Sequence, residues 1–257
     1  MTQSRAFHWQ DRFKASAIHL GLSLIVASLA ALLVFGLWYP YPYRDTSGGR
    51  ELFLIVIMVD VILGPLITLA VFNRNKPRSE LVRDLTVVGL IQLAALGYGL
   101  WTVFVARPVH LVFEYDRFRV VHAIEVPEEL LAQALDDVRK MPLTGPTVLA
   151  LRPFRDVNEE GTATLMALQG LPLSARPDLW QAYPQARQRV LAAAKPLGEL
   201  RKRFPQQATL IDASVVQSGR SAEELVYLPM VARKSFWTVL LDARSAELRG
   251  FVALDSF

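Results

Sequence analysis

The stretch that decides the fold runs from Leu52 to Phe72 and reads LFLIVIMVDVILGPLITLAVF, with Asp60 as its single charged residue. About 20 apolar helical residues are enough to cross a bilayer core roughly 30 Å thick. Two further stretches meet this length, around residues 18–38 and 85–106. We therefore predict three transmembrane helices, over about 18–38, 52–72 and 85–106.

The first stretch has an alternative interpretation as a cleaved signal peptide, because Arg5, Arg12 and Lys14 precede it. A signal-peptide core is shorter, about 7–15 residues, and ends in a small-residue cleavage site. Here the apolar run continues to Trp38 and ends in Tyr39-Pro. The pattern favours a retained membrane anchor, with aromatic residues 38–43 in the interfacial belt.

Loop charges predict the orientation. The N-terminal tail and the loop at 73–84 are rich in Lys and Arg, whereas the loop at 39–51 is balanced by acids. Positive loops stay in the cytoplasm. We expect a multi-pass protein of the inner membrane, with a cytoplasmic N-terminus and with residues 107–257 in the periplasm.

Composition excludes several classes of function. The sequence has no cysteine, which rules out disulfides, thiolate catalysis and cysteine zinc sites. Residues 107–257 hold nineteen Lys and Arg against eighteen Asp and Glu. A nucleic-acid-binding domain usually carries a basic excess, so we expect no nucleic acid as a partner.

Residues 107–257 read as a small α+β domain, set apart from a transmembrane domain at 1–106. Alternating runs around Tyr115-Asp116 and around Ala243 predict two β-hairpins, and Thr147–Leu151 predicts a strand. Helices are expected from Pro127 to Val138, over 162–168, from Pro177 to about Lys195, and on to Arg203. The fold class is thus an α-helical bundle of three transmembrane helices plus this domain.

Asp60 is the most informative residue, because a carboxylate within a bilayer costs several kcal/mol unless it is paired or protonated. It could be a proton or ion site, a contact for a partner's helix, or a hydrogen-bonding group within the protein, with partners among Ser23, Ser28, Gln92 and Tyr98. The last two alternatives are favoured. Gly64-Pro65 predicts a kink, and glycines at 89, 97 and 99 predict a face for close helix packing.

Signatures of enzymes and metal sites are missing: there is no G-x-S-x-G, P-loop or HExxH, and the four histidines lack metal-ligand spacing. We expect no enzyme, no catalytic residue, no cofactor and no metal. A basic segment in the soluble part is either a solvated helix face or a contact for anionic lipid or an acidic partner; it comprises Arg187, Arg189, Lys195, Arg201, Lys202 and Arg203.

Several segments, in order over roughly residues 5–126, resemble the type IV pilin accessory protein family known as TfpX/TfpZ. They are Trp38-Tyr-Pro-Tyr-Pro, Val59-Asp-Val-Ile-Leu-Gly-Pro-Leu-Ile-Thr-Leu, Arg83-Asp-Leu, Gln92-Leu-Ala-Ala-Leu-Gly-Tyr-Gly, Arg107-Pro-Val and Val112-Phe-Glu-Tyr-Asp-Arg-Phe-Arg-Val-Val. The remaining residues resemble the family only in length and general pattern.

The resemblance implies an inner-membrane accessory factor that assists or modulates assembly of a type IV pilin into surface pili, and hence twitching motility. Its implied partners are the major pilin, other pilus-assembly proteins and the lipid bilayer. Alternatives are a pilin-modifying enzyme similar to a glycosyltransferase, or a small transporter or sensor subunit. The candidate helix-contact or structural residues are Asp60, Gly64, Pro65, Gln92, Arg107, Asp116 and Arg117.

Overall fold

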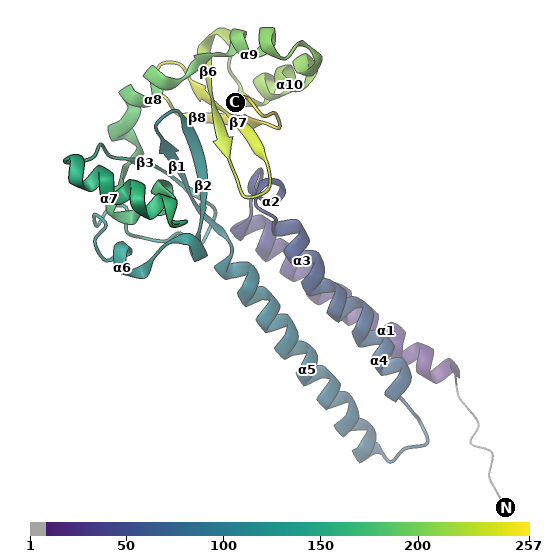
Figure 1. The fold of residues 1–257 in the computed structure, drawn as a ribbon. Helices are drawn as coiled ribbons and strands as arrows, with labels where there is room; N and C mark the ends of the chain where they lie inside the picture. The colour runs from purple at the N-terminus through teal and green to yellow at the C-terminus, as the bar shows by residue number, and fades with distance from the viewer. Residues whose placement is uncertain (1–8) are drawn as a thin grey trace, which may run out of the picture. The chain divides into compact units, whose positions relative to one another are not determined.

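The computed structural model describes residues 9–257 (Figure 1). Arg5 and His8 lie outside them. The chain forms two compact units. The first, here the helical unit, comprises Met1–Leu37 and Gly49–Phe104; the second, here the sheet unit, comprises Trp38–Gly48 and Val105–Phe257.

Three long helices make up the helical unit and run up, down and up (Figure 1). All three are long and apolar enough to cross a membrane, which confirms the predicted three-span class. Their segments are α1 (Trp9–Leu33) with the π-helical turn η1 (Val34–Trp38), α3 (Gly49–Met58) with the π-helical turn η2 (Val59–Leu63) and α4 (Gly64–Val71), and finally α5 (Arg78–Val105).

One face of α1 forms the seam with α4. The hydroxyl of Ser16 donates to the carbonyl of Pro65 at 2.9 Å, and His19 Nδ1 lies 2.5 Å from Thr68 Oγ1. Arg12 donates to the carbonyls of Leu69 and Ala70 at the end of α4. The spacing of these residues, four and then three, keeps them on one side of the helix. The same stripe continues through the buried residues Ser23, Ala27, Ala30 and Val34.

The sheet unit is built on a mixed sheet with the strand order β4-β3-β1-β2-β6-β7-β8, and β5 pairs with β6. The β1–β3 and β2–β6 pairs are parallel, whereas the other pairs are antiparallel. The strands are β1 (Pro108–Glu114), β2 (Arg117–His122), β3 (Thr147–Leu151), β4 (Trp180–Ala182), β5 (Lys195–Pro196), β6 (Leu225–Val231), β7 (Phe236–Asp242) and β8 (Leu248–Val252).

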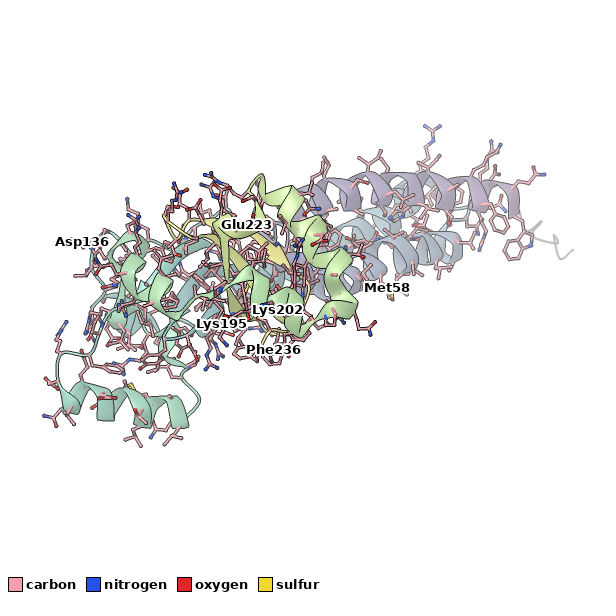
Figure 2. The ribbon with its side chains drawn as sticks, turned by 90° about the horizontal axis from the view of Figure 1, so that it is seen from above. Met58, Asp136, Lys195, Lys202, Glu223 and Phe236 are labelled. Atoms are coloured by element: carbon pink, nitrogen blue, oxygen red, sulfur yellow. The ribbon has the colours of Figure 1, made fainter. Side chains whose placement is uncertain are left out.

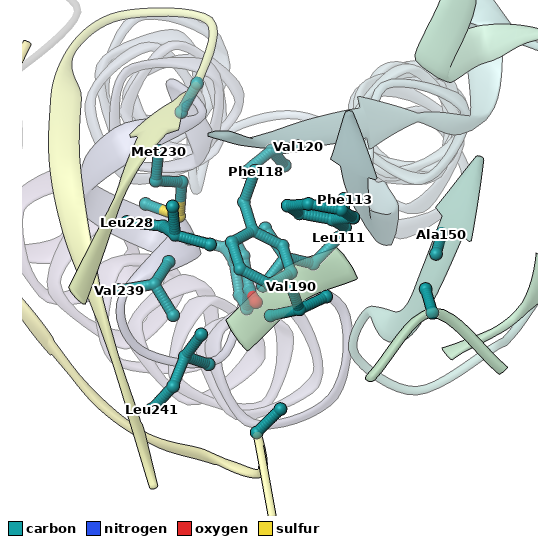
Figure 3. Close-up of a cluster of buried hydrophobic side chains, with 14 residues drawn as sticks. Leu111, Phe113, Phe118, Val120, Ala150, Val190, Leu228, Met230, Val239 and Leu241 are labelled. Atoms are coloured by element: carbon teal, nitrogen blue, oxygen red, sulfur yellow. The ribbon is translucent and has the colours of Figure 1, made fainter. Parts of the chain in front are cut away.

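Six α-helices accompany the sheet: α2 (Tyr43–Thr46), α6 (Glu128–Leu131), α7 (Val157–Leu168), α8 (Arg187–Ala193), α9 (Leu197–Arg203) and α10 (Ala208–Ser218). Figure 3 shows the largest core cluster, where Phe113, Phe118 and Leu111 meet Val190 of α8 and Val239 of β7. A second cluster centres on Trp180 and Leu179, and a third joins α9 and α10 to Tyr227 and Leu240. The predicted α+β class is confirmed.

Two predicted helices are wrong. The segment from Pro177 to Lys195 forms a short 3₁₀ turn, strand β4, a second 3₁₀ turn and only then α8. Pro184 lies in the second turn, where its missing N–H breaks a continuous helix. The helix from Pro127 ends at Leu131 and is followed by turns. Ala134 and Val138, which would lie on the apolar face of the longer predicted helix, are nevertheless buried.

Residues 38–48 belong to the sheet unit, although they connect the first two long helices. Tyr43 is buried in the largest core cluster, and its ring meets that of Phe251 edge to face at 5.9 Å. The backbone N–H of Lys234 donates to the carbonyl of Thr46 at 3.0 Å. The sequence places Tyr39 and Tyr43 in an interfacial aromatic belt, but both are buried residues of the sheet unit, exposed by 0% and 6%.

Candidate functional site

Asp60 lies in η2, the π-helical turn of the second long helix, and only 7% of it is exposed. The N–H of Gly64 bonds to the carbonyl of Val59, five residues earlier, instead of four. Pro65 explains this widening, because its ring has no N–H for the next bond and crowds the preceding turn. Such π-helical turns are rare in proteins overall, but those that occur are often found at functional sites.

The Asp60 carboxylate is incompletely satisfied. Within residues 9–257, its Oδ1 has no hydrogen-bond partner. The His19 ring lies near enough to interact electrostatically with the carboxylate, but its Nδ1 bonds to Thr68. Of the partners expected from the sequence, Ser23 and Gln92 share a cavity with Asp60. Ser28 instead donates to the carbonyl of Leu24 within its own helix.

This cavity, here the Asp60 cavity, has a volume of about 420 Å³ and lies between α1, the second long helix and α5. Apolar side chains form most of its wall, and His19, Ser23, Asp60, Thr68 and Gln92 are its polar members. The full lining is Ala15, Ile18, His19, Leu22, Ser23, Val26, Asp60, Thr68, Leu85, Gly89, Gln92, Leu93 and Leu96.

Gly64 and Gly99 are the points where α5 approaches the second long helix. A Cβ at Gly64 would overlap the Gln92 amide and lie 3.1 Å from His19 Nε2. A Cβ at Gly99 would meet both methyl groups of Val56 at 2.7 Å. The predicted site residues Asp60, Gly64, Pro65 and Gln92 are therefore neighbours in space, because the second long helix turns Gly64 toward α5.

The other predicted residues lie in the sheet unit. Arg107 is 5% exposed, and its guanidinium donates to the carbonyl of Pro142 at 3.2 and 3.4 Å. Asp116 and Arg117 lie at the turn between β1 and β2, where Arg117 Nε bonds to Asp116 Oδ1 at 2.8 Å. The turn is tight because Tyr115 adopts a left-handed φ of 56°.

Most of the basic segment is used inside the sheet unit. Arg187 and Arg189 donate to the carbonyls of Arg244 and Leu151, and Arg201 pairs with Asp212. Arg203 donates to the carbonyls of Ser256 and Phe257. Lys195 and Lys202 are exposed, and both are labelled in Figure 2. The segment thus serves mainly internal contacts.

Among residues 9–257, no group of three or more His, Cys, Asp or Glu side chains is placed to hold a metal ion. The cavity also contains two polar residues that the sequence did not identify as part of a site, Thr68 and His19, which bond to each other. Their spacing of 49 residues carries no local signal. Only the rotation of α1 against α4 brings them together.

These features define a class: a protein with three helices long and apolar enough to cross a membrane and an α+β unit, in which the buried polar residues of the helices gather at one cavity. The profile of the family "Fimbrial assembly protein FimB" matches residues 7–48. The fimbrial assembly protein of Dichelobacter nodosus serogroup I is 35% identical over 246 residues, which is 95% of each chain. The serogroup E1 protein is 34% identical over the same shares.

A shorter relative, the fimbrial assembly protein of D. nodosus serogroups C1 and C2, is 40% identical over 121 residues, or 47% of this chain and 92% of its own. The present chain belongs to this family of fimbrial assembly proteins. No solved structure matches it.

Proposed function

We propose that this protein is an inner-membrane accessory factor that assists or modulates assembly of a type IV pilin into surface pili by binding the pilin. The observation that carries the proposal is the match to the serogroup I fimbrial assembly protein. It extends over 95% of both chains and so includes the helical unit and the sheet unit together. We therefore propose a function in assembly for the two units together.

The Asp60 cavity supports binding of the pilin rather than a purely structural role. Helices associate in lipid through close packing and hydrogen bonds across small-residue faces. The helical unit supplies both, because a Cβ added at Gly89, in the wall of the cavity, would have no atom within 4 Å and Asp60 keeps an unused acceptor. The loop charges favour a cytoplasmic N-terminus and a periplasmic sheet unit.

A gene deletion in the native strain tests the function. We expect surface pili and twitching motility to fall much more than the total amount of pilin, because the defect lies in assembly. Sheared-pilus yield and whole-cell immunoblots of pilin measure the two quantities. Unchanged piliation contradicts the proposal.

A pull-down tests the binding. The full-length protein, solubilised from native membranes, should retain the major pilin, and other pilus-assembly proteins should follow in smaller amounts. Mass spectrometry identifies them, and an unrelated three-span protein with the same tag is the control. Absence of pilin from the retained proteins argues against direct binding.

The proposal has the protein act without catalysis. Pilin from the deletion strain should therefore have the same intact mass as pilin from the parent strain. A mass difference equal to a sugar or another added group would instead identify a pilin-modifying enzyme. Alkaline phosphatase fused after Phe257 should be active, since the sheet unit is proposed to lie in the periplasm.

A further inference from the structure

We propose that the Asp60 cavity binds a transmembrane helix of the partner and that a cationic group of that helix pairs with the Asp60 carboxylate. This inference rests on the proposed function, in which the partner is a pilin, and it assigns the site and the chemistry of the contact. The occupant is a helix that carries an amine or a guanidinium at the depth of Asp60.

The first argument is the cost of Asp60. A carboxylate in the membrane interior persists when it is paired or when it has a function. Asp60 is 7% exposed and lines the cavity, and its Oδ1 has no partner among residues 9–257. An unmet buried acceptor is destabilising until a donor reaches it.

The second argument is that two polar side chains beside the cavity bond to groups other than Asp60. His19 Nδ1 bonds to Thr68, and Ser16 donates to the carbonyl of Pro65. The amide of Gln92 lies against Gly64. These contacts hold the walls of the cavity in place and leave Asp60 Oδ1 without a donor among residues 9–257.

The third argument is the shape of the walls. On α5, Leu85, Gly89, Leu93 and Leu96 form a stripe at helical spacing, and on α1 a matching stripe runs from Ala15 to Val26. Each stripe spans 11 steps of 1.5 Å, or about 17 Å along its helix. Two stripes of equal length fit one face of a helix from the partner better than they fit a small molecule. Gly89 allows its backbone to come close.

The fourth argument is charge. An ionised carboxylate accepts hydrogen bonds only, and bonds from a cation are about twice as strong as those between neutral groups. Within lipid, such a cation also avoids the cost of being buried alone. The site therefore selects a helix with a basic group, whereas a uniformly apolar helix would leave Asp60 unpaired.

Site-specific photo-crosslinking in the native strain tests the site. A photoreactive residue replaces Leu93, which lines the cavity, or Ile91, which does not; both positions are 64% exposed on α5. We expect pilin crosslinks from position 93 and far fewer from position 91. Equal yields from the two positions overturn the site, while the pull-down with the unmodified protein still decides the proposed function.

The charge is tested with the probe at position 93. Asp60→Asn should lower the crosslink to pilin about tenfold or more, the factor expected for one bond to a charged group. Asp60→Glu should retain more of the crosslink than Asp60→Asn. An Asp60→Asn crosslink equal to that of the wild type, at equal protein level, overturns the pairing.

If the Asp60→Asn variant fails to accumulate, a second pair of variants tests the site. Gly89→Leu fills the cavity, whereas Gly97→Leu adds the same side chain on α5 outside it, and neither glycine has an atom within 4 Å of an added Cβ. With an unmodified Asp60, pull-down of pilin should fall for Gly89→Leu and persist for Gly97→Leu. Equal retention by both overturns the proposal.

Discussion

Tyr43 has a different role in the structure from the one that its place in the sequence suggests. An aromatic residue next to a predicted span suggests a membrane interface, yet Tyr43 fills the largest core cluster of the sheet unit. Burial raises the pKa of its phenol above the ordinary value. Sequence alone could not show this, because the contact with Phe251 joins positions 208 residues apart.

Tyr43→Ala should therefore destabilise the sheet unit by about 3–5 kcal/mol, the range for removing a large buried aromatic side chain. Tyr43→Phe keeps the ring and should cost far less. Denaturant titration of the detergent-solubilised protein, followed by tryptophan fluorescence, measures both. Similar stabilities for the two variants would mean that the ring is not a core element.

His110 predicts a pH dependence. Burial, and next the charge of Arg107, lower the pKa of His110 from 6.5 to about 3; its Nδ1 lies 2.8 Å from Thr147 Oγ1. Below pH 6.5 the unfolded chain binds a proton at this residue that the folded chain does not. The contribution of His110 to the free energy of unfolding should be fully present above pH 6.5. It should be lost as the pH falls, by at most about 1.4 kcal/mol per pH unit.

Unfolding free energies at pH 7.5, 6.5, 5.5 and 5.0 check this expectation. The His110→Gln variant should lose less stability over the same interval than the wild type, since it lacks the titrating ring. Parallel curves for the two proteins would show that other groups carry the pH dependence.

Asp60 itself could be singled out from the sequence, because a charge inside an apolar run is costly wherever the chain folds. Its surroundings could not. Gln92 was one of four candidate neighbours, and the structure selects it together with Ser23. Thr68 and the hydrogen-bonded His19 depend on how α1 is rotated about its axis, which an almost uniformly apolar helix does not encode in its pattern.

At the scale of elements, Gly64 sets the approach of α5. Gly64→Ala would drive its methyl group into the Gln92 amide, and because that amide ends a flexible side chain, the cost should lie near the lower end of the roughly 1–3 kcal/mol of overpacking. Gly97→Ala is the matched control, because no atom lies within 4 Å of its added Cβ. We expect only Gly64→Ala to loosen α5 from the second long helix.

A disulfide reports this loosening. The sequence has no cysteine, and a Cβ at Gly99 would lie 3.2 Å from the Cβ of Val56, a few tenths of an ångström short of the roughly 3.5–4.5 Å usual in disulfides. The double variant Val56→Cys and Gly99→Cys should crosslink in mild oxidant, and Gly64→Ala should slow the reaction. An unchanged rate would mean that Gln92 moves aside without displacing α5.

Elements with a local signal were predicted well, and those that depend on distant pairing were not. The hairpins around Tyr115 and Ala243 follow from alternation and turns. Strand β6, which contains Pro229, was not predicted from the sequence. The strand tolerates this proline because the ladder with β2 involves only Met230 and Val231, just beyond it.

At the scale of the whole molecule, the sheet unit is incomplete without residues 38–48. A fragment of residues 105–257 would expose the core surface that Tyr43 covers. A synthetic peptide of residues 38–48 should bind it and raise its melting temperature with increasing concentration, as expected for a ligand of the folded state. A peptide with Tyr43→Ala should have a much smaller effect.

The inclusion of residues 38–48 also has a mechanical consequence. The chain passes between the two units three times, after Leu37, after Gly48 and after Phe104. A load applied to the sheet unit would be shared among three covalent connections. A single linker would act as a swivel, whereas three connections resist twisting and transmit a pull directly to all three long helices.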